Sequence, residues 1–172
     1  MHADDVTRGP GAAARLSLLL VIVLAVVVVV IGTSLEWGSL AVRGRLVISE
    51  GGLGEWQGVV ALAAALAGAT CGALGMAARS MVAGALGALV AGVVIVVVSV
   101  SEVVHLVGRP EVIAEVVRAG ARSIPLPGYV VPLIESTIGP GVWVTLAGGA
   151  VLAAVGLATL VWSTWRRRAR AV

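Results

Sequence analysis

Two long apolar segments without a charged residue follow one another in the middle of the chain, Gly58 to Ala77 and Met81 to Val100, joined only by Ala78-Arg79-Ser80. At a rise of about 1.5 Å per residue, a helix over either segment is long enough to cross a hydrocarbon core of roughly 30 Å. The short connection cannot cross back, so the two helices must be antiparallel neighbours. The segments therefore predict a transmembrane helical hairpin.

Small residues recur at helical spacing within this hairpin and again near the carboxyl end of the chain. In lipid, burial of apolar surface cannot bring helices together, and small side chains matter because they let two backbones approach and gain dispersion contacts. We expect one set of residues to pack helix against helix: Ala61, Ala65, Gly68, Ala69, Gly72, Ala73, Gly84, Ala88, Gly92, Gly149 and Ala153.

The composition is that of a membrane protein, with 59% hydrophobic and 12% charged residues and a mean hydropathy of +1.08. These values lie far from the balance of a soluble domain. A chain of 172 residues has room for one bundle of about four spans and an ordered loop. The predicted fold class is an all-α membrane protein, a four-transmembrane-helix bundle.

Apolar runs and polar breaks divide the chain into a tail (1–15), a membrane domain (16–165) and a basic tail (166–172). A signal peptide is the alternative for the first run, because basic residues precede it. The run is longer than an ordinary signal-peptide core, and no A-x-A-like site follows it, so we expect an anchor. The expected spans are 16–35, 58–77, 81–100 and 141–162, and the expected outer loops are 36–57 and 101–140.

Both outer loops carry patterns of local structure. In the first, apolar residues alternate with polar or small ones around Gly44, which predicts a short β-hairpin. In the second, Pro110 to Ala121 places charged residues on one stripe and Val and Ile on another, which predicts an amphipathic helix lying on the membrane or capping the bundle. Prolines between Ile124 and Pro140 then favour extended or turning backbone.

Aromatic and basic residues indicate how the bundle sits in the membrane. Tryptophan is common where helices meet lipid headgroups, and we expect this anchoring role for Trp37, Trp56, Trp143, Trp162 and Trp165. Arginines crowd the membrane edge at both tails, which predicts a plasma-membrane protein with both termini cytoplasmic. We expect Arg166, Arg167, Arg168 and Arg170 to bind anionic headgroups, unless they serve only to fix the topology.

The sequence contains few residues of the kinds that bind metals or catalyse reactions. Glu102 and His105 lie three residues apart, so one helical face could present both to a metal, but one pair supplies too few ligands. We therefore expect no metal site and favour a solvated or hydrogen-bonded surface pair, with metal binding by Glu102 and His105 as the alternative. No P-loop, G-x-G-x-x-G or H-E-x-x-H pattern is present, and the expected spans contain no acid or base of the kind that marks ion pathways. We therefore expect no cofactor and no enzymatic activity.

The small-residue hairpin, the Glu55-Trp56 pair before it and the closing GVWVTLAGGAVLAAVGLATLVWSTWRRRAR resemble the actinobacterial tryptophan-associated transmembrane proteins. The resemblance implies a four-span protein and no known reaction. An actinobacterial source also fits the exclusive use of Arg as the basic residue, a bias of GC-rich genomes. The layout is similar to that of claudin-like proteins too, but the cysteine pair of their first outer loop is missing.

These observations favour a non-enzymatic accessory or scaffold subunit of a larger membrane complex. Its expected partners are the bilayer and other membrane subunits or further copies of the chain. The basic residues are divided between loops and tails, which does not favour nucleic-acid binding. The alternatives are a small transporter, channel component or lipid-handling protein, and a metal-dependent enzyme using Glu102 and His105.

Overall fold

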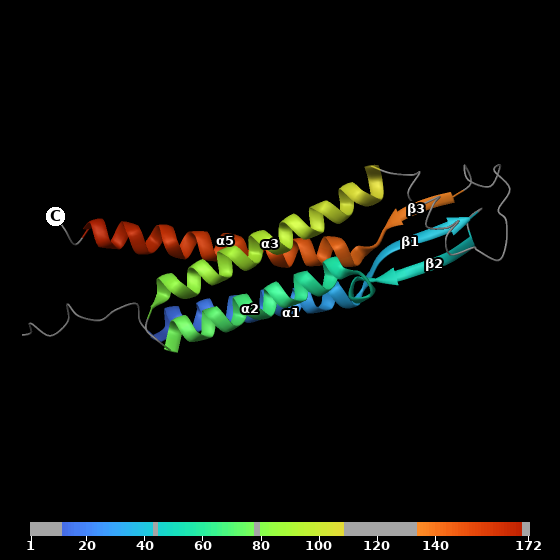
Figure 1. Ribbon diagram of the computed structural model, residues 1–172. Helices are drawn as coiled ribbons and strands as arrows, with labels where there is room; N and C mark the ends of the chain where they lie inside the picture. The colour runs from blue at the N-terminus through green and yellow to red at the C-terminus, as the bar shows by residue number, and fades with distance from the viewer. Residues whose placement is uncertain (1–11, 43–44, 78–79, 109–133, 170–172) are drawn as a thin grey trace, which may run out of the picture.

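The computed structural model describes residues 12–42, 45–77, 80–108 and 134–169. These residues form a bundle of long helices with a small sheet at one end (Figure 1). The helices are α1 (Ala12–Ser34), α2 (Trp56–Ala77), α3 (Met81–Gly108) and α5 (Pro140–Ala169). Both ends of the described chain, at the start of α1 and the end of α5, lie at the end of the bundle away from the sheet.

Each of the four helices is long and apolar enough to cross a membrane. The qualifying stretches are Leu16–Ser34, Trp56–Gly75, Met81–His105 and Pro140–Arg166. The predicted bundle of four transmembrane helices is confirmed, and the chain is a multi-pass membrane protein by the length and composition of these helices. The third stretch runs beyond the expected end at Val100, which brings Glu102 into the helix bundle.

The helices form a ring in which each one packs against two neighbours. Helix α3 packs most extensively on α5 and α2, and α1 completes the ring by contacting α5 and, less closely, α2. Helices α2 and α5 therefore occupy opposite corners. The core between the helices is made of small and β-branched side chains, among them Val29, Ala65, Ala88 and Ile95.

The expected packing residues lie mostly on the inward faces. A Cβ added to Gly68 would lie 2.6 Å from the Cβ of Ala91, and one added to Gly149 would lie 2.6 Å from Cγ2 of Ile95, so both glycines allow close crossings with α3. The other residues of that set that are buried are Ala61, Ala65, Gly72, Gly84, Ala88 and Gly92, and those half-buried are Ala69 and Ala153.

Ala73 is the exception, because it is exposed. A step of four residues turns a helix by about 400°, so a series with this spacing drifts by about 40° at each step. Ala61 and Ala65 are fully buried, Ala69 is half-buried, and Ala73 has turned out of the interface. Gly68 and Gly72, each seven residues after a buried alanine, continue the inward face.

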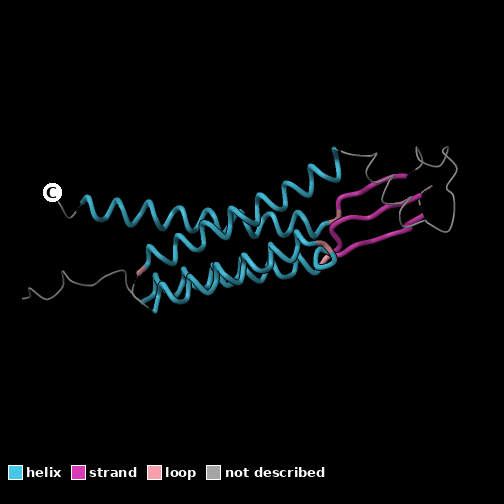
Figure 2. Tube along the Cα trace, in the orientation of Figure 1, coloured by secondary structure: helices cyan, strands magenta, loops and turns pink. Residues whose placement is uncertain are grey.

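The sheet extends the bundle at the end opposite the chain termini (Figure 2). Strands β1 (Glu36–Val42) and β2 (Arg45–Gly51) form the predicted hairpin, which is confirmed. A strand that the sequence did not predict, β3 (Ile134–Ile138), pairs antiparallel with β1 and gives the order β2-β1-β3. The pairing joins the segment between α1 and α2 to the segment just before α5, with Ser39 Oγ and Thr137 Oγ1 2.7 Å apart across the strands.

Trp37 lies at the junction of bundle and sheet, and its expected role as an interface anchor is wrong. Only 1% of its surface is exposed, and its indole Nε1–H donates to the carbonyl of Gly32 at 2.9 Å. The ring fits between two glycines: a Cβ added to Gly52 would lie 2.5 Å from Cε2, and one added to Gly141 would lie 2.6 Å from Cδ1. The first β-strand turns this side chain inward, so Trp37 closes the end of the core.

The predicted amphipathic helix, Pro110 to Ala121, lies outside the described residues. The same holds for most of the proline-rich segment from Ile124 to Pro140. Its last part forms β3, which agrees with the extended backbone expected there.

Candidate functional site

The surfaces that the helices turn away from the core differ from one helix to the next. On α1, every exposed residue from Leu20 to Ile31 is Leu, Val or Ile. On α3, every exposed residue from Leu86 to Val100 is likewise Leu or Val. Large aliphatic side chains of this kind suit contact with lipid tails, so α1 and α3 present ordinary lipid-facing surfaces.

Helix α2 exposes small residues in the middle of its outward face, next to the larger side chains of Val59, Leu66 and Leu74. Ala63, Ala67 and Thr70 are all exposed, and they follow one another at the spacing of a single helical face. The hydroxyl of Thr70 donates to the carbonyl of Leu66 at 2.8 Å, so the Thr70 hydroxyl proton is satisfied within its own helix. We call Ala63, Ala67 and Thr70 the α2 outer face.

Helix α5 has a second face of the same kind. Ala147, Ala150 and Ala154 are exposed on one side of the helix, opposite the glycines that pack against α1 and α3. We call these three residues the α5 outer face. Because α2 and α5 stand at opposite corners of the ring, the two outer faces look in opposite directions.

Small side chains exposed to lipid let another helix approach closely at these positions. The sequence indicated small residues on α2 and α5, but it could not separate the inward set from the outward one. In the folded bundle, the exposure of each residue distinguishes the inward-facing small residues from the outward-facing ones. The arrangement can bind membrane-spanning helices on two sides, and the exposed thiol of Cys71 lies next to Thr70 on α2.

A second feature is a set of buried polar side chains near the sheet end of the bundle. Thr33, Ser99, Glu102 and Thr145 are all buried, and they come from α1, α3 and α5. Ser99 lies about one turn beyond Ile95, and Thr145 about one turn before Gly149, which packs on Ile95; the antiparallel helices therefore bring both to a similar level. We call these four residues the polar layer.

The prediction that the spans contain no buried acid is wrong for Glu102, of which only 6% is exposed. Glu102 lies just beyond the expected end of the third span at Val100, but α3 continues to Gly108 and keeps the carboxyl group inside the bundle. The hydroxyls of Ser99 and Thr145 are also buried, and within the described residues neither has a hydrogen-bond partner. Buried hydroxyls of this kind can hold water molecules or fix the register of the helices.

Glu102 and His105 differ in exposure, since the imidazole of His105 is exposed while the carboxyl group is buried. Within the described ranges, no three His, Cys, Asp or Glu side chains come together as a group that could hold a metal. Three residues leave the two positions about 60° apart on the helix, so Glu102 faces the core while His105 lies at the edge of that face and reaches the surface.

The remaining expected anchors are exposed tryptophans at the two ends of the bundle. Trp56 and Trp143 begin α2 and α5 near the sheet, and Trp162 and Trp165 lie near the end of α5. The rings of the latter two are 6.5 Å apart, and the guanidinium carbon of Arg166 lies 4.9 Å from the ring centre of Trp162.

The arginines expected at headgroups are described only in part. The side chains of Arg166 and Arg168 are exposed. The side chain of Arg167 and the whole of Arg170 lie outside what the structure describes.

No model of a known protein family matches the chain, and a comparison with curated proteins gives no match either. The resemblance to the tryptophan-associated transmembrane family stays a prediction.

Proposed function

We propose that this membrane protein is a non-enzymatic accessory or scaffold subunit that binds neighbouring membrane-spanning helices along its α2 and α5 outer faces. One observation carries the proposal: small residues are exposed in the middle of these two helices, while α1 and α3 expose only large aliphatic residues over the same depth. Two such faces on opposite corners suit a subunit that bridges two neighbours.

The physical argument rests on what an exposed alanine does in lipid. It gains less dispersion energy from lipid tails than a leucine would, but it allows a second backbone to approach and make many contacts at once. A helix that only faced lipid would have no reason to keep such residues. The partners that fit best are apolar helices, including those of further copies of this chain.

The test compares the same substitution on different faces. Ala67→Ile and Ala154→Ile should each weaken cross-linking to the neighbour in native membranes by about tenfold, equivalent to about 1.4 kcal/mol. Ala83→Ile is the matched control, because Ala83 is exposed on α3, outside both outer faces. Purification in mild detergent as a monodisperse monomer without any co-purifying protein would contradict the proposal.

The proposed location is the plasma membrane, with both termini in the cytoplasm and the sheet outside. Support comes from the arginines at the tails and from the position of both described chain ends at one end of the bundle. In a Cys71→Ala background, Ser49→Cys should react with an impermeant maleimide on intact cells, and Ala169→Cys should react only after lysis. Labelling of Ala169→Cys on intact cells would reverse the topology.

Membership of the actinobacterial tryptophan-associated family is part of the same proposal. It is supported by the four-span pattern and by the sequence of the last span.

A small transporter or channel component is the second candidate, and the polar layer favours it. A carboxyl group within a membrane bundle is commonly part of an ion or proton pathway. In liposomes, the wild-type chain would then carry a proton or cation flux that Glu102→Gln abolishes. Absence of any flux above that of empty liposomes would remove this candidate.

A further inference from the structure

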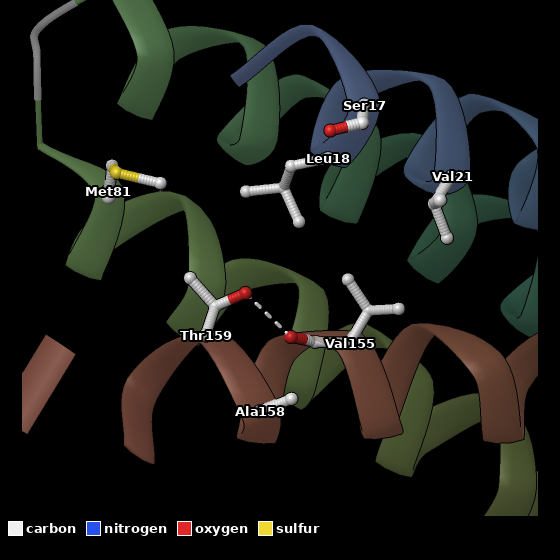
Figure 3. A pocket seen from close by; sticks show the side chains of 7 residues that line it. All are labelled: Ser17, Leu18, Val21, Met81, Val155, Ala158 and Thr159. Atoms are coloured by element: carbon white, nitrogen blue, oxygen red, sulfur yellow. Dashed lines mark hydrogen bonds between the residues drawn. The ribbon is translucent and has the colours of Figure 1, made fainter. Parts of the chain in front are cut away.

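A groove of about 340 Å³ lies between α1 and α5 at the end of the bundle away from the sheet. Leu18 and Val21 reach into it from α1, and Val155 reaches into it from α5 (Figure 3). Its remaining lining residues are Ser17, Met81, Ala158 and Thr159. The hydroxyl of Thr159 donates to the carbonyl of Val155 at 2.8 Å, so this wall of the groove is effectively apolar.

The groove follows from how α1 and α5 are held together. Near the sheet, Gly32 lies so close to α5 that an added Cβ would be 2.6 Å from the backbone nitrogen of Thr145. Further along, a Cβ added to Gly148 would be 3.1 Å from the carbonyl oxygen of Ala25. Beyond that point α5 meets α1 through Val155 and Ala158 instead of glycine, and the helices no longer close on each other.

The α5 wall of the groove continues directly into a basic, aromatic segment. Trp162 follows Thr159 by three residues and Arg166 follows Trp162 by four, so all three lie along one side of the helix. Side chains of a helix lean toward its amino end, and Arg166 accordingly folds back over the Trp162 ring, toward the groove. The backbone of Arg166 lies about 10 Å along the helix from that of Thr159.

The lining decides what suits the groove. Its walls are almost entirely apolar and it lies near one end of the membrane-spanning helices, where an acyl chain of a bilayer lipid can lie against them. Charge decides the headgroup, since Arg166 and Arg168 are exposed on this part of α5, and the sequence adds Arg167 and Arg170.

We propose that the groove between α1 and α5 is a specific site for an anionic phospholipid, with an acyl chain against Leu18, Val21 and Val155 and the phosphate on Arg166. Trp162 holds the arginine in place by its cation–π contact and supplies a ring at the level of the glycerol backbone. The groove borders the α5 outer face, because Ala158 lies one turn beyond Ala154 on the same side of α5.

The experiment uses the full chain, reconstituted into vesicles of phosphatidylcholine and phosphatidylglycerol and then extracted in mild detergent. Native mass spectrometry measures which lipid remains bound. The wild-type chain should retain phosphatidylglycerol in preference to phosphatidylcholine. Arg166→Ala should lower that preference about fivefold, the effect of one arginine at a membrane surface.

Two pairs of variants distinguish specific lipid binding in the groove from non-specific attraction of anionic lipid to the arginines. Arg168→Ala should change the preference much less, because residue 168 lies about 200° around the helix from residue 166. Ala158→Leu should fill the groove and lower retention of both lipids, whereas Ala83→Leu, the same change outside the groove, should not. Equal effects of the two arginine variants, or none from Ala158→Leu, would overturn the proposal.

A measurement without vesicles separates a lipid from its headgroup alone. The thermal transition of the purified chain should rise with added phosphatidylglycerol and stay unchanged with inorganic phosphate or glycerophosphoglycerol. Equal stabilisation by the free headgroup would show an anion site without a role for the groove. Equal stabilisation by phosphatidylcholine would show that Arg166 selects no headgroup, and either result contradicts the proposal.

Discussion

Replacement of Trp37 tests whether this residue closes the core, as the structure shows, or anchors the protein at the membrane surface. Trp37→Phe removes the indole donor to Gly32. The Gly32 carbonyl keeps a second donor, the Leu35 nitrogen at 3.3 Å, so the loss should stay near 1 kcal/mol. Trp37→Ala also empties the space of a fully buried ring and should cost about 3–5 kcal/mol of unfolding free energy.

A substitution at Gly52 tests the position of the Trp37 ring independently. An added Cβ would lie 2.5 Å from Cε2 of Trp37, so Gly52→Ala should destabilise the wild-type chain by about 1–3 kcal/mol. In the Trp37→Ala background that clash is absent, although the Thr33 carbonyl oxygen, 2.8 Å from the added Cβ, keeps part of the cost. The two changes should therefore be less harmful together than their sum, by about 1 kcal/mol.

Unfolding by sodium dodecyl sulfate in mixed micelles, followed by circular dichroism, measures these free energies. Trp143→Ala is the matched control, because Trp143 is half exposed at the same end of the bundle. A Trp37→Ala variant no less stable than the Trp143→Ala variant would refute the reasoning. So would strict additivity with Gly52→Ala.

Other substitutions probe the interior. Thr145→Val exchanges a buried hydroxyl without a partner in the described chain for a methyl group, and should raise the unfolding free energy by up to about 1 kcal/mol in the same assay; a loss would reveal a bound water. Gly92→Ala would place a Cβ 2.6 Å from the Gly149 carbonyl oxygen between two backbones, and should cost about 3 kcal/mol. Gly54→Ala, with nothing within 4 Å of its added Cβ, should be neutral, and an equal loss would contradict the close-crossing account.

The sequence was sufficient to predict the helix bundle, because each span is recognisable as a long apolar segment without charged residues. It was also sufficient for the β1–β2 hairpin, where the alternation is local. It was not sufficient for β3, because a strand of five residues that pairs with β1 across a long separation leaves no local pattern. Trp37 shows the same limit, since a tryptophan next to a predicted span looks the same whether it faces headgroups or a glycine-lined core.

The candidate sites were predictable only in part. Composition placed small residues on α2 and α5, but only the folded ring shows that Ala73 and the two outer faces point away from it. Hydropathy marked Glu102 as the end of a span, while the geometry of α3 carries it into the polar layer. The groove depends on how α1 and α5 diverge, and this depends on contacts between residues more than a hundred positions apart.

The pairing of β3 with β1 has a mechanical consequence for those two helices. It ties the end of α1 to the start of α5 through adjacent strands, and the close approach of Gly32 to α5 reinforces that tie. At their other ends, no strand among the described residues links them. Helices α1 and α5 are therefore held together at the sheet end and can separate at the other end. A change in bilayer thickness, or in the lipid between these free ends, would change the tilt of α5.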